Sequence, residues 1–180
     1  IPAFPGAGGC IEGGILDAQL LPRAIQPTTF GEIGGRKSSR EEALAYIFRK
    51  SHIPYQIVPE MHHWQISHLG VIIPLADAYY QSRHPEKICV NEKLMTLTAY
   101  RMKKNLKWIA QKGMLCPAKL YMIKDMPTGM LARVLSRVYQ SEFGNKFLYR
   151  HAMHAPEEFQ RLHQEFYNYM KTHTKESNKA

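Results

Sequence analysis

The sequence has few cysteines and no long hydrophobic run, and each absence excludes a class of protein. Its three cysteines, Cys10, Cys89 and Cys116, are widely spaced and form no C-x-x-C pair, which favours reduced thiols over a disulfide framework or a zinc site. No stretch approaches the roughly 18 apolar residues of a membrane-spanning helix, and no basic and then apolar leader is visible. We therefore expect a soluble, cytoplasmic protein without membrane partners.

The chain also lacks a phosphate-binding glycine loop. A dinucleotide fingerprint, G-x-G-x-x-G, must follow a strand and open a helix. Gly6 and Gly8 supply the first two glycines, but Ile11 occupies the third position. The G-xxxx-G spacing that starts at Gly8 is not followed by Lys and then Ser or Thr, so a P-loop is excluded too. We interpret this segment as a tight glycine turn that uses positive φ angles.

The apolar content is that of a globular protein. The chain has 180 residues, 44% of them hydrophobic, and it begins at Ile1 in turn-rich sequence, which suggests a truncated or processed polypeptide. We expect an α+β fold in three parts. Residues 1–60 form the end of an α/β domain, residues 61–172 form a helical domain, and residues 173–180 form a flexible tail.

Residues 1–60 alternate short apolar runs with glycine, proline and threonine, which is typical of strands. The predicted strands contain Ile15–Leu16, Leu20–Leu21, Thr28–Phe30 and Tyr55–Val58. One helix interrupts them. Ser38 and Ser39 are each followed three residues later by a glutamate, so either serine can begin this helix with a capping box. Pro54 predicts that the helix ends by Ser51.

From Glu60 onward the hydrophobic period becomes helical. Side chains of one broad helix face recur at Trp64, His68, Val71, Ile72, Leu75 and Tyr79. Pro74 removes a backbone hydrogen bond inside this helix, at a cost of about 3 kcal/mol, so we expect a kink or a break between Gly70 and Pro74. Further helices are predicted at about 86–112, 117–123, 128–143 and 156–171.

The formal net charge is +9. Arg101, Lys103, Lys104 and Lys107 form a local basic cluster, but the aromatic residues beside them do not make a platform for stacked bases. We interpret the cluster as a solvated helix face and expect no nucleic-acid partner. A positive field would also steer anionic ligands toward the protein.

Three segments in a fixed order connect the chain to a known family. They are FPGAGG at residues 4–9, QPTTFGE at residues 26–32, and WQISH at residues 64–68, which runs into Pro74. In this order and at these separations they resemble the second half of a ketopantoate reductase-like oxidoreductase, up to about Phe166. The resemblance implies a remnant of a Rossmann-type sheet, followed by an all-α C-terminal domain of the 6-phosphogluconate dehydrogenase C-terminal type.

Enzymes of this family reduce a 2-oxo acid with NADPH in a cleft between two domains. The resemblance therefore implies NADP as the cofactor, with its main binding domain missing from this chain, and a small 2-oxo acid as the substrate. It also implies that Pro5, Gly6, Gly8 and Thr28 border the nicotinamide. We expect the protein to form a homodimer.

The family's catalytic lysine, on the first long helix of the helical domain, has no counterpart here. Its position is Ile66 when counted from Trp64, or Gln65 when counted back from Pro74. His68 can act as a general acid near neutral pH and is our catalytic candidate, although two residues of helix turn it about 200° away from position 66. The alternative is a structural role. His62 and His63 point to different faces, so we expect no metal site.

Glu158 is the second catalytic candidate. It matches best the place of a glutamate that, in the family, contacts the substrate or the cofactor on a late helix. The alternative is helix stabilisation, because Glu157 and Glu158 follow Pro156, and acidic side chains in a first turn interact favourably with the helix dipole.

Two functions of different class follow from these residues. The first is the C-terminal part of an NADP-dependent 2-oxo acid reductase, in which this chain alone is inactive. The second is a non-catalytic helical module that dimerises or binds a partner through its apolar helices.

Overall fold

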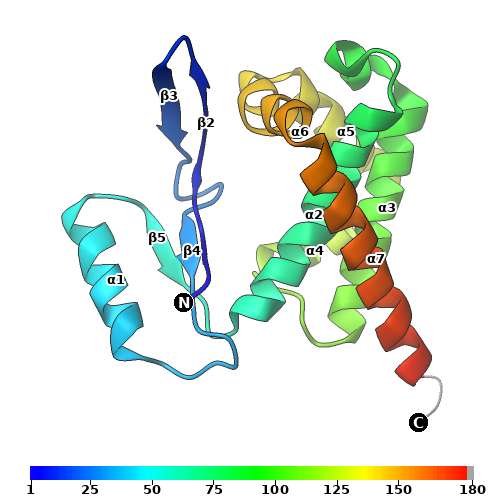
Figure 1. Ribbon diagram of the computed structural model, residues 1–180. Helices are drawn as coiled ribbons and strands as arrows, with labels where there is room; N and C mark the ends of the chain where they lie inside the picture. Colours follow the sequence, from blue (N-terminus) through cyan, green and yellow to red (C-terminus); the bar gives the residue numbers. More distant parts are fainter. Residues whose placement is uncertain (178–180) are drawn as a thin grey trace. The chain divides into compact units, whose positions relative to one another are not determined.

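The computed structural model describes residues 1–177, with small sheets in the N-terminal part and helices in the rest (Figure 1). The predicted mixed α+β class is thus confirmed. The chain divides into two compact units, residues 1–65 and the residues from 66 onward, whereas the sequence predicted a boundary after residue 60.

The first unit contains a three-stranded sheet of order β1-β4-β5, made of β1 (Ala3–Phe4), β4 (Thr28–Phe30) and β5 (Tyr55–Ile57). β4 pairs antiparallel with β1 and parallel with β5, and helix α1 (Ser39–Lys50) connects the parallel pair. Phe30 is fully buried, and its ring stacks on Tyr55 with 5.8 Å between the ring centroids. Phe48 of α1 lies beside both rings. Apolar strand residues therefore form the core of this unit.

A separate hairpin consists of β2 (Ala7–Glu12) and β3 (Ile15–Leu20). Gly13 and Gly14 make its turn with φ angles of 58° and 79°, and a two-residue hairpin turn of type I′ needs such positive values at both positions. The predicted glycine turn is confirmed at these two residues. Gly8, by contrast, lies within strand β2.

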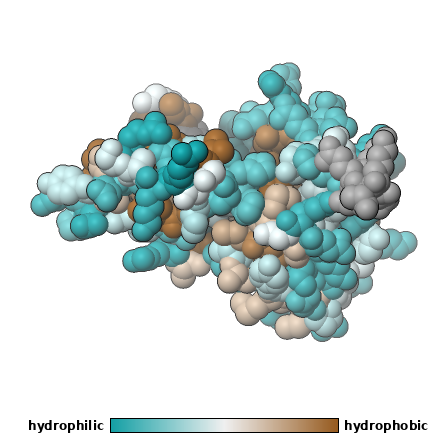
Figure 2. Space-filling model, turned by 90° about the horizontal axis from the view of Figure 1, so that it is seen from below, coloured by the Kyte–Doolittle hydropathy of each residue, from teal (hydrophilic) through white to brown (hydrophobic). Residues whose placement is uncertain are grey.

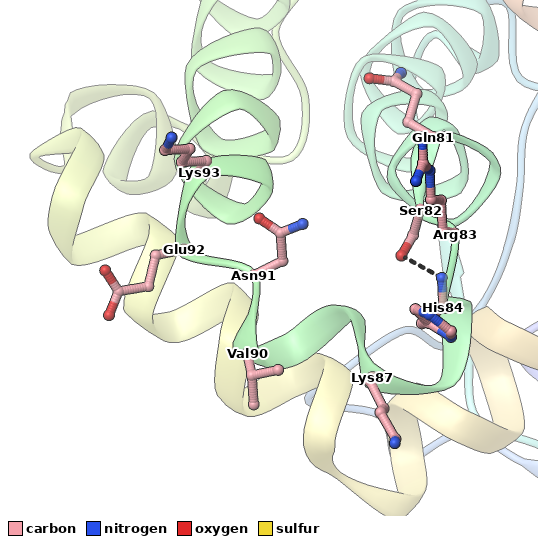
Figure 3. A pocket seen from close by; sticks show the side chains of 9 residues that line it. All are labelled: Gln81, Ser82, Arg83, His84, Lys87, Val90, Asn91, Glu92 and Lys93. Atoms are coloured by element: carbon pink, nitrogen blue, oxygen red, sulfur yellow. Dashed lines mark hydrogen bonds between the residues drawn. The ribbon is translucent and has the colours of Figure 1, made fainter.

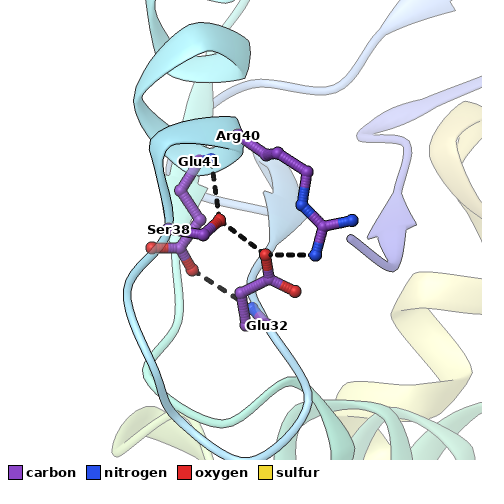
Figure 4. A network of polar contacts seen from close by, with 4 residues as sticks. All are labelled: Glu32, Ser38, Arg40 and Glu41. Atoms are coloured by element: carbon purple, nitrogen blue, oxygen red, sulfur yellow. Dashed lines mark hydrogen bonds and ion pairs between the residues drawn. The ribbon is translucent and has the colours of Figure 1, made fainter.

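Helix α1 begins at Ser38, one of the two predicted serines, but without the full capping box, because the Glu41 carboxylate accepts from the Glu32 backbone N–H at 3.1 Å. Ser38 is the N-cap, and its hydroxyl accepts a hydrogen bond from the backbone N–H of Glu41 at 3.4 Å. The same hydroxyl donates to the Glu32 carboxylate, which also pairs with Arg40 (Figure 4). The hydrogen bond from Ser38 is the main cause that lowers the pKa of Glu32. The helix ends at Lys50 with Ser51 as its C-cap, which is the predicted stop.

The second unit is helical. In chain order its elements are α2 (Met61–Gln81, which starts in the first unit), the 3-10 helix η1 (Pro85–Val90), α3 (Glu92–Gln111), α4 (Lys119–Asp125), α5 (Thr128–Gln140), the π-helix η2 (Gly144–Tyr149), α6 (Arg150–His154) and α7 (Pro156–Ser177). The helix predicted at 86–112 is divided, because the Asn91 side chain accepts from the Leu94 N–H and begins α3. α7 continues into the predicted tail, whose residues 178–180 lie outside the described residues.

Hydrophobic side chains reach the surface in both units. Figure 2 shows one side of the protein, on which hydrophobic residues are interspersed among hydrophilic ones. Ile11 and Leu16 of the hairpin and Met122 and Met130 of the helical unit are all more than half exposed. None of the helices within residues 1–177 combines the length and apolar character needed to span a bilayer.

α2 does not break at Pro74. It runs as one helix from Met61 to Gln81, so a break, one of the two predicted outcomes, is wrong. Proline has no N–H, and the carbonyl that loses its usual donor is that of Gly70, four residues earlier. The side-chain amide of Asn105 donates to this carbonyl at 3.3 Å. A residue of another helix therefore replaces the missing backbone donor.

Asn105 joins α2, α3 and α7. It lies on α3 and is only 1% exposed, and its amide nitrogen also donates to the Tyr167 hydroxyl of α7 at 3.3 Å. Gly70 permits the approach, because a Cβ at that position would lie 2.7 Å from Ile109 of α3. Ile109 and Leu106 are fully buried in the apolar core of the unit. The apolar core of the helical unit thus encloses a polar side chain, Asn105, whose amide is hydrogen-bonded.

Asn105→Ala should destabilise the helical unit by about 1–3 kcal/mol, because it leaves the Gly70 carbonyl buried without a donor. Pro74→Ala restores a backbone N–H for that carbonyl, so the cost of Asn105→Ala should fall by about half or more in a Pro74→Ala background. Urea unfolding followed by circular dichroism measures the four free energies. Asn168→Ala, exposed on α7, is the control. Equal costs in both backgrounds would show that Asn105 does not compensate for the proline.

Candidate functional site

The four residues predicted to border a nicotinamide lie in the first unit. Pro5 is exposed, Gly8 is half-buried, and Gly6 and Thr28 are buried against each other. The Gly6 N–H donates to the Thr28 hydroxyl at 3.1 Å. A Cβ at Gly6 would lie 2.4 Å from the backbone oxygen of Gln26, so only glycine fits there. The structure therefore brings Gly6 and Thr28 together as a packing contact.

These residues do not form a cradle for a pyrophosphate. Such a cradle needs backbone N–H groups that point at the ligand from the start of a helix. Here the Gly6 amide is already bonded, and Gly8 pairs with Gln19 in the β2–β3 ladder. The chain continues from this segment into a hairpin rather than a helix. The phosphates of a dinucleotide therefore do not fit this segment.

His68 lies on α2 and is half-buried. Burial, and to a lesser degree the neighbouring His151 of α6, lowers the pKa of His68 to about 4. The imidazole is therefore neutral at pH 7, where almost no molecules carry the second proton. A neutral imidazole can still polarise a carbonyl group as a hydrogen-bond donor.

The structure distinguishes the two positions counted for the family's lysine. Ile66 belongs to the apolar core of the helical unit and is 5% exposed, so a lysine there would place an ammonium among hydrophobic side chains. Gln65 is half-exposed and can accept a lysine without burying its charge. Ser67 has a structural role, because its hydroxyl donates to the Met114 carbonyl and accepts from the Cys116 N–H.

Glu158 lies exposed in the first turn of α7. Its charge acts on Tyr80 of α2, whose pKa is raised mainly by burial and then by Asp77 and Glu158. The Tyr80 hydroxyl donates to the backbone oxygen of Ala152 at 2.7 Å.

His68 and Glu158 lie near different parts of α2: His68 belongs to this helix, whereas Glu158 of α7 acts on Tyr80, close to the end of α2. Tyr80, which lies near Glu158, follows His68 by twelve residues, or about 18 Å of helix. The Phe159 ring connects the two regions, with centroid distances of 6.4 Å to Tyr80 and 5.2 Å to His151.

Sequence analysis missed a polar network at Asp77, on the face of α2 about 180° away from His68. His163 of α7 contacts the Asp77 carboxylate through Nδ1 at 2.9 Å, and its ring lies 4.6 Å from that of Tyr167. Tyr167 in turn accepts the hydrogen bond from Asn105. A carboxylate on Nδ1 orients an imidazole and leaves Nε2 for another partner. The available signal was Asp77, the one acidic residue of α2.

An open pocket of about 760 Å³ lies where α2 ends, along η1 and at the start of α3 (Figure 3). Its lining residues are mostly polar or basic: Gln81, Ser82, Arg83, His84, Lys87, Val90, Asn91, Glu92 and Lys93. None of the predicted catalytic or cofactor-binding residues lines it. Within residues 1–177, no three His, Cys, Asp or Glu side chains come together in a way that could hold a metal ion.

Comparison with known proteins found no relative. The chain matches no protein-family model, no curated protein and no solved structure. The resemblance to ketopantoate reductases therefore stays a prediction made from the residues themselves.

As the pH falls from 7 to 5, the helical unit should lose about 2 kcal/mol of stability through His68. The unfolded imidazole binds its proton near pH 6.5 and the folded one only near pH 4, so protons favour the unfolded state in this window. Urea unfolding at both pH values measures the loss. It should shrink by that amount in His68→Gln and stay unchanged in His154→Gln, an exposed control on α6. An equal loss in wild type and His68→Gln would show that burial does not keep His68 neutral.

Proposed function

We propose that the chain is the C-terminal part of an NADP-dependent oxidoreductase of the ketopantoate reductase type, which reduces a 2-oxo acid. One combined observation carries the proposal. The three motif segments stand in the family's order. The first spans the end of β1 and the start of β2, the second contains β4, which pairs in parallel with β5 across the crossover helix α1, and the third lies in α2, the long helix with an internal proline. In this proposal the first unit is the end of a Rossmann-type domain, and the second is a C-terminal domain of the 6-phosphogluconate dehydrogenase type.

The proposed roles follow from the chemistry of each residue. When bound, NADPH would supply a hydride to the carbonyl carbon of the substrate, and the alkoxide that this leaves would take a proton from water. Neutral His68 donates a hydrogen bond to the carbonyl oxygen. Glu158 lies too far from His68 to contact the same small substrate, so its proposed role is a contact with the cofactor. Pro5, Gly6, Gly8 and Thr28 border the nicotinamide, whereas the pyrophosphate contacts come from a domain outside this chain. The protein acts as a homodimer in the cytoplasm, without nucleic-acid or membrane partners.

The 180-residue chain alone should bind NADPH only weakly, with a Kd above about 100 μM, because it has no pyrophosphate cradle. Fluorescence titration of the purified chain measures this affinity. The coding sequence upstream should add a strand, a G-x-G-x-x-G/A turn and a helix, and the extended protein should bind NADPH at least about tenfold more tightly. Low-micromolar binding by the chain alone would refute the assignment as a C-terminal part.

In the full-length protein, Gln65→Lys should raise kcat for 2-oxo acid reduction by about tenfold or more, because a positioned general acid contributes about 10²–10⁴-fold. Ile66→Lys is the matched comparison and should bring instability without a gain, since position 66 is buried. His68→Ala should lower the wild-type rate by about tenfold. Steady-state rates of the three variants and the wild type, with NADPH and a panel of 2-oxo acids, test these predictions. An unchanged rate in His68→Ala would make His68 structural.

A second candidate function is favoured by exposed apolar side chains in the helical unit. Met130 and Val134 lie four residues apart on α5, and both are exposed. Val90, at the end of η1, is 77% exposed. Apolar groups on one helix face are typical of a surface that binds a partner. A non-catalytic dimerisation or partner-binding module would show no turnover in the reductase assay, with or without lysine at position 65.

A further inference from the structure

The net positive charge of the protein comes from one segment of the helical unit. Residues 83–140 contain twelve Lys and Arg and only three Asp and Glu. The rest of the chain contains twelve of each sign, so this segment carries the entire net charge of +9. It comprises η1, α3, α4 and α5. A net charge gathered in one segment produces a local positive field, which attracts anionic partners.

The outer side of α3 concentrates part of this charge in a stripe. At about 100° per residue, Lys93, Tyr100, Lys104 and Lys107 fall within a sector of about 60°. All four are exposed, and the buried side of the helix is opposite. The stripe extends for about 21 Å from Lys93 to Lys107. We call these four residues the α3 stripe.

Among the side chains that the structure describes, no carboxylate pairs with the lysines of the α3 stripe. Glu92 is the only acidic residue of α3, and α5, which packs against α3, has none. None of the three stripe lysines has an ion pair among the described residues. Lys103 of α3 reaches the Thr128 hydroxyl at the start of α5, and α5 adds the exposed Arg133 and Arg137.

The open pocket continues the basic surface beyond the start of α3. Lys93 belongs to both, and the pocket adds Arg83 and Lys87. In Figure 3 the side chain of Glu92 points away from the opening, so the one carboxylate of its lining does not offset these cations there.

We propose that the α3 stripe binds an acidic segment of another protein. Carboxylates complement its lysines, and an apolar side chain of the partner covers Tyr100 and the adjacent Leu97, both exposed. A second copy of this chain is disfavoured on this face, since equal basic surfaces repel each other. This interaction is independent of the reductase function proposed above.

The structure disfavours two other polyanions. Single-stranded nucleic acid binds by stacking successive bases on aromatic rings. Tyr100 is the one exposed aromatic residue of α3, because Trp108 is half-buried and its indole N–H donates to Thr174 at 2.9 Å. An anionic membrane requires a larger apolar face to insert than Leu97 and Tyr100 provide. Both polyanions are nevertheless tested as competitors.

The test is fluorescence anisotropy with a labelled 20-residue helical peptide in which Glu and Leu alternate at i, i+4 and i+7 spacing. The probe should bind the protein at low salt, and its Kd should rise by about tenfold from 50 to 300 mM NaCl. Lys104→Glu with Lys107→Glu should weaken binding by about tenfold or more. The matched control is Arg36→Glu with Lys37→Glu, two exposed cations of the first unit that produce the same change in net charge. This control should change the Kd less than about twofold.

Circular dichroism and urea unfolding confirm that both double variants are folded. Lys104→Gln with Lys107→Gln, which removes charge without reversing it, should give an intermediate loss. If the control pair weakens binding of the probe equally, the effect depends only on net charge, and the proposal that the α3 stripe is the binding site is refuted. Tighter, stripe-dependent binding to a 24-nucleotide single-stranded DNA, or to vesicles with 30% phosphatidylserine, would overturn the assignment to an acidic protein.

Discussion

The helical unit depends on one side-chain amide, which replaces a backbone hydrogen bond that is missing in the helix α2. Pro74 leaves the Gly70 carbonyl without a backbone donor, and Asn105 supplies one from α3. An unsatisfied buried carbonyl costs about 1–3 kcal/mol. Because the contact is made, α2 stays a single helix. His68 and Asp77, on either side of Pro74, therefore keep fixed positions relative to each other.

Local signals in the sequence predicted much of the fold. Ser38 begins α1, Ser51 ends it, and Gly13 with Gly14 make the hairpin turn, because each depends only on the conformation or hydrogen bonding of neighbouring residues. The continuity of α2 could not be predicted in this way. The rule for proline considers the helix alone, whereas the compensating donor, Asn105, lies 35 residues away from Gly70 in sequence.

In the candidate site, too, features that depend on neighbouring residues could be predicted, and features that depend on tertiary packing could not. The sequence identified His68 as a polar residue on a long helix, but not that burial would leave it neutral at pH 7. It also offered Ile66 and Gln65 as equal positions for a lysine, and only packing separates them, since Ile66 is in the core. His163 was missed because its partner, Asp77, is 86 residues distant. Nothing local to α7 indicates that pair.

The two sides of α3 have different roles: the inner side packs in the core and stabilises the unit, and the outer side carries exposed lysines. Lys103 and Lys107, and likewise Lys104 and Lys107, lie one helical turn apart, and like charges at such spacing destabilise a helix by about 0.2–0.5 kcal/mol per pair. The inner side more than offsets this, because Met102, Leu106 and Ile109 are buried and Asn105 holds two other helices. A helix anchored so firmly can keep uncompensated lysines on its outer side. An exposed helix without that anchor would need carboxylates at the same spacing, which α3 lacks beyond Glu92.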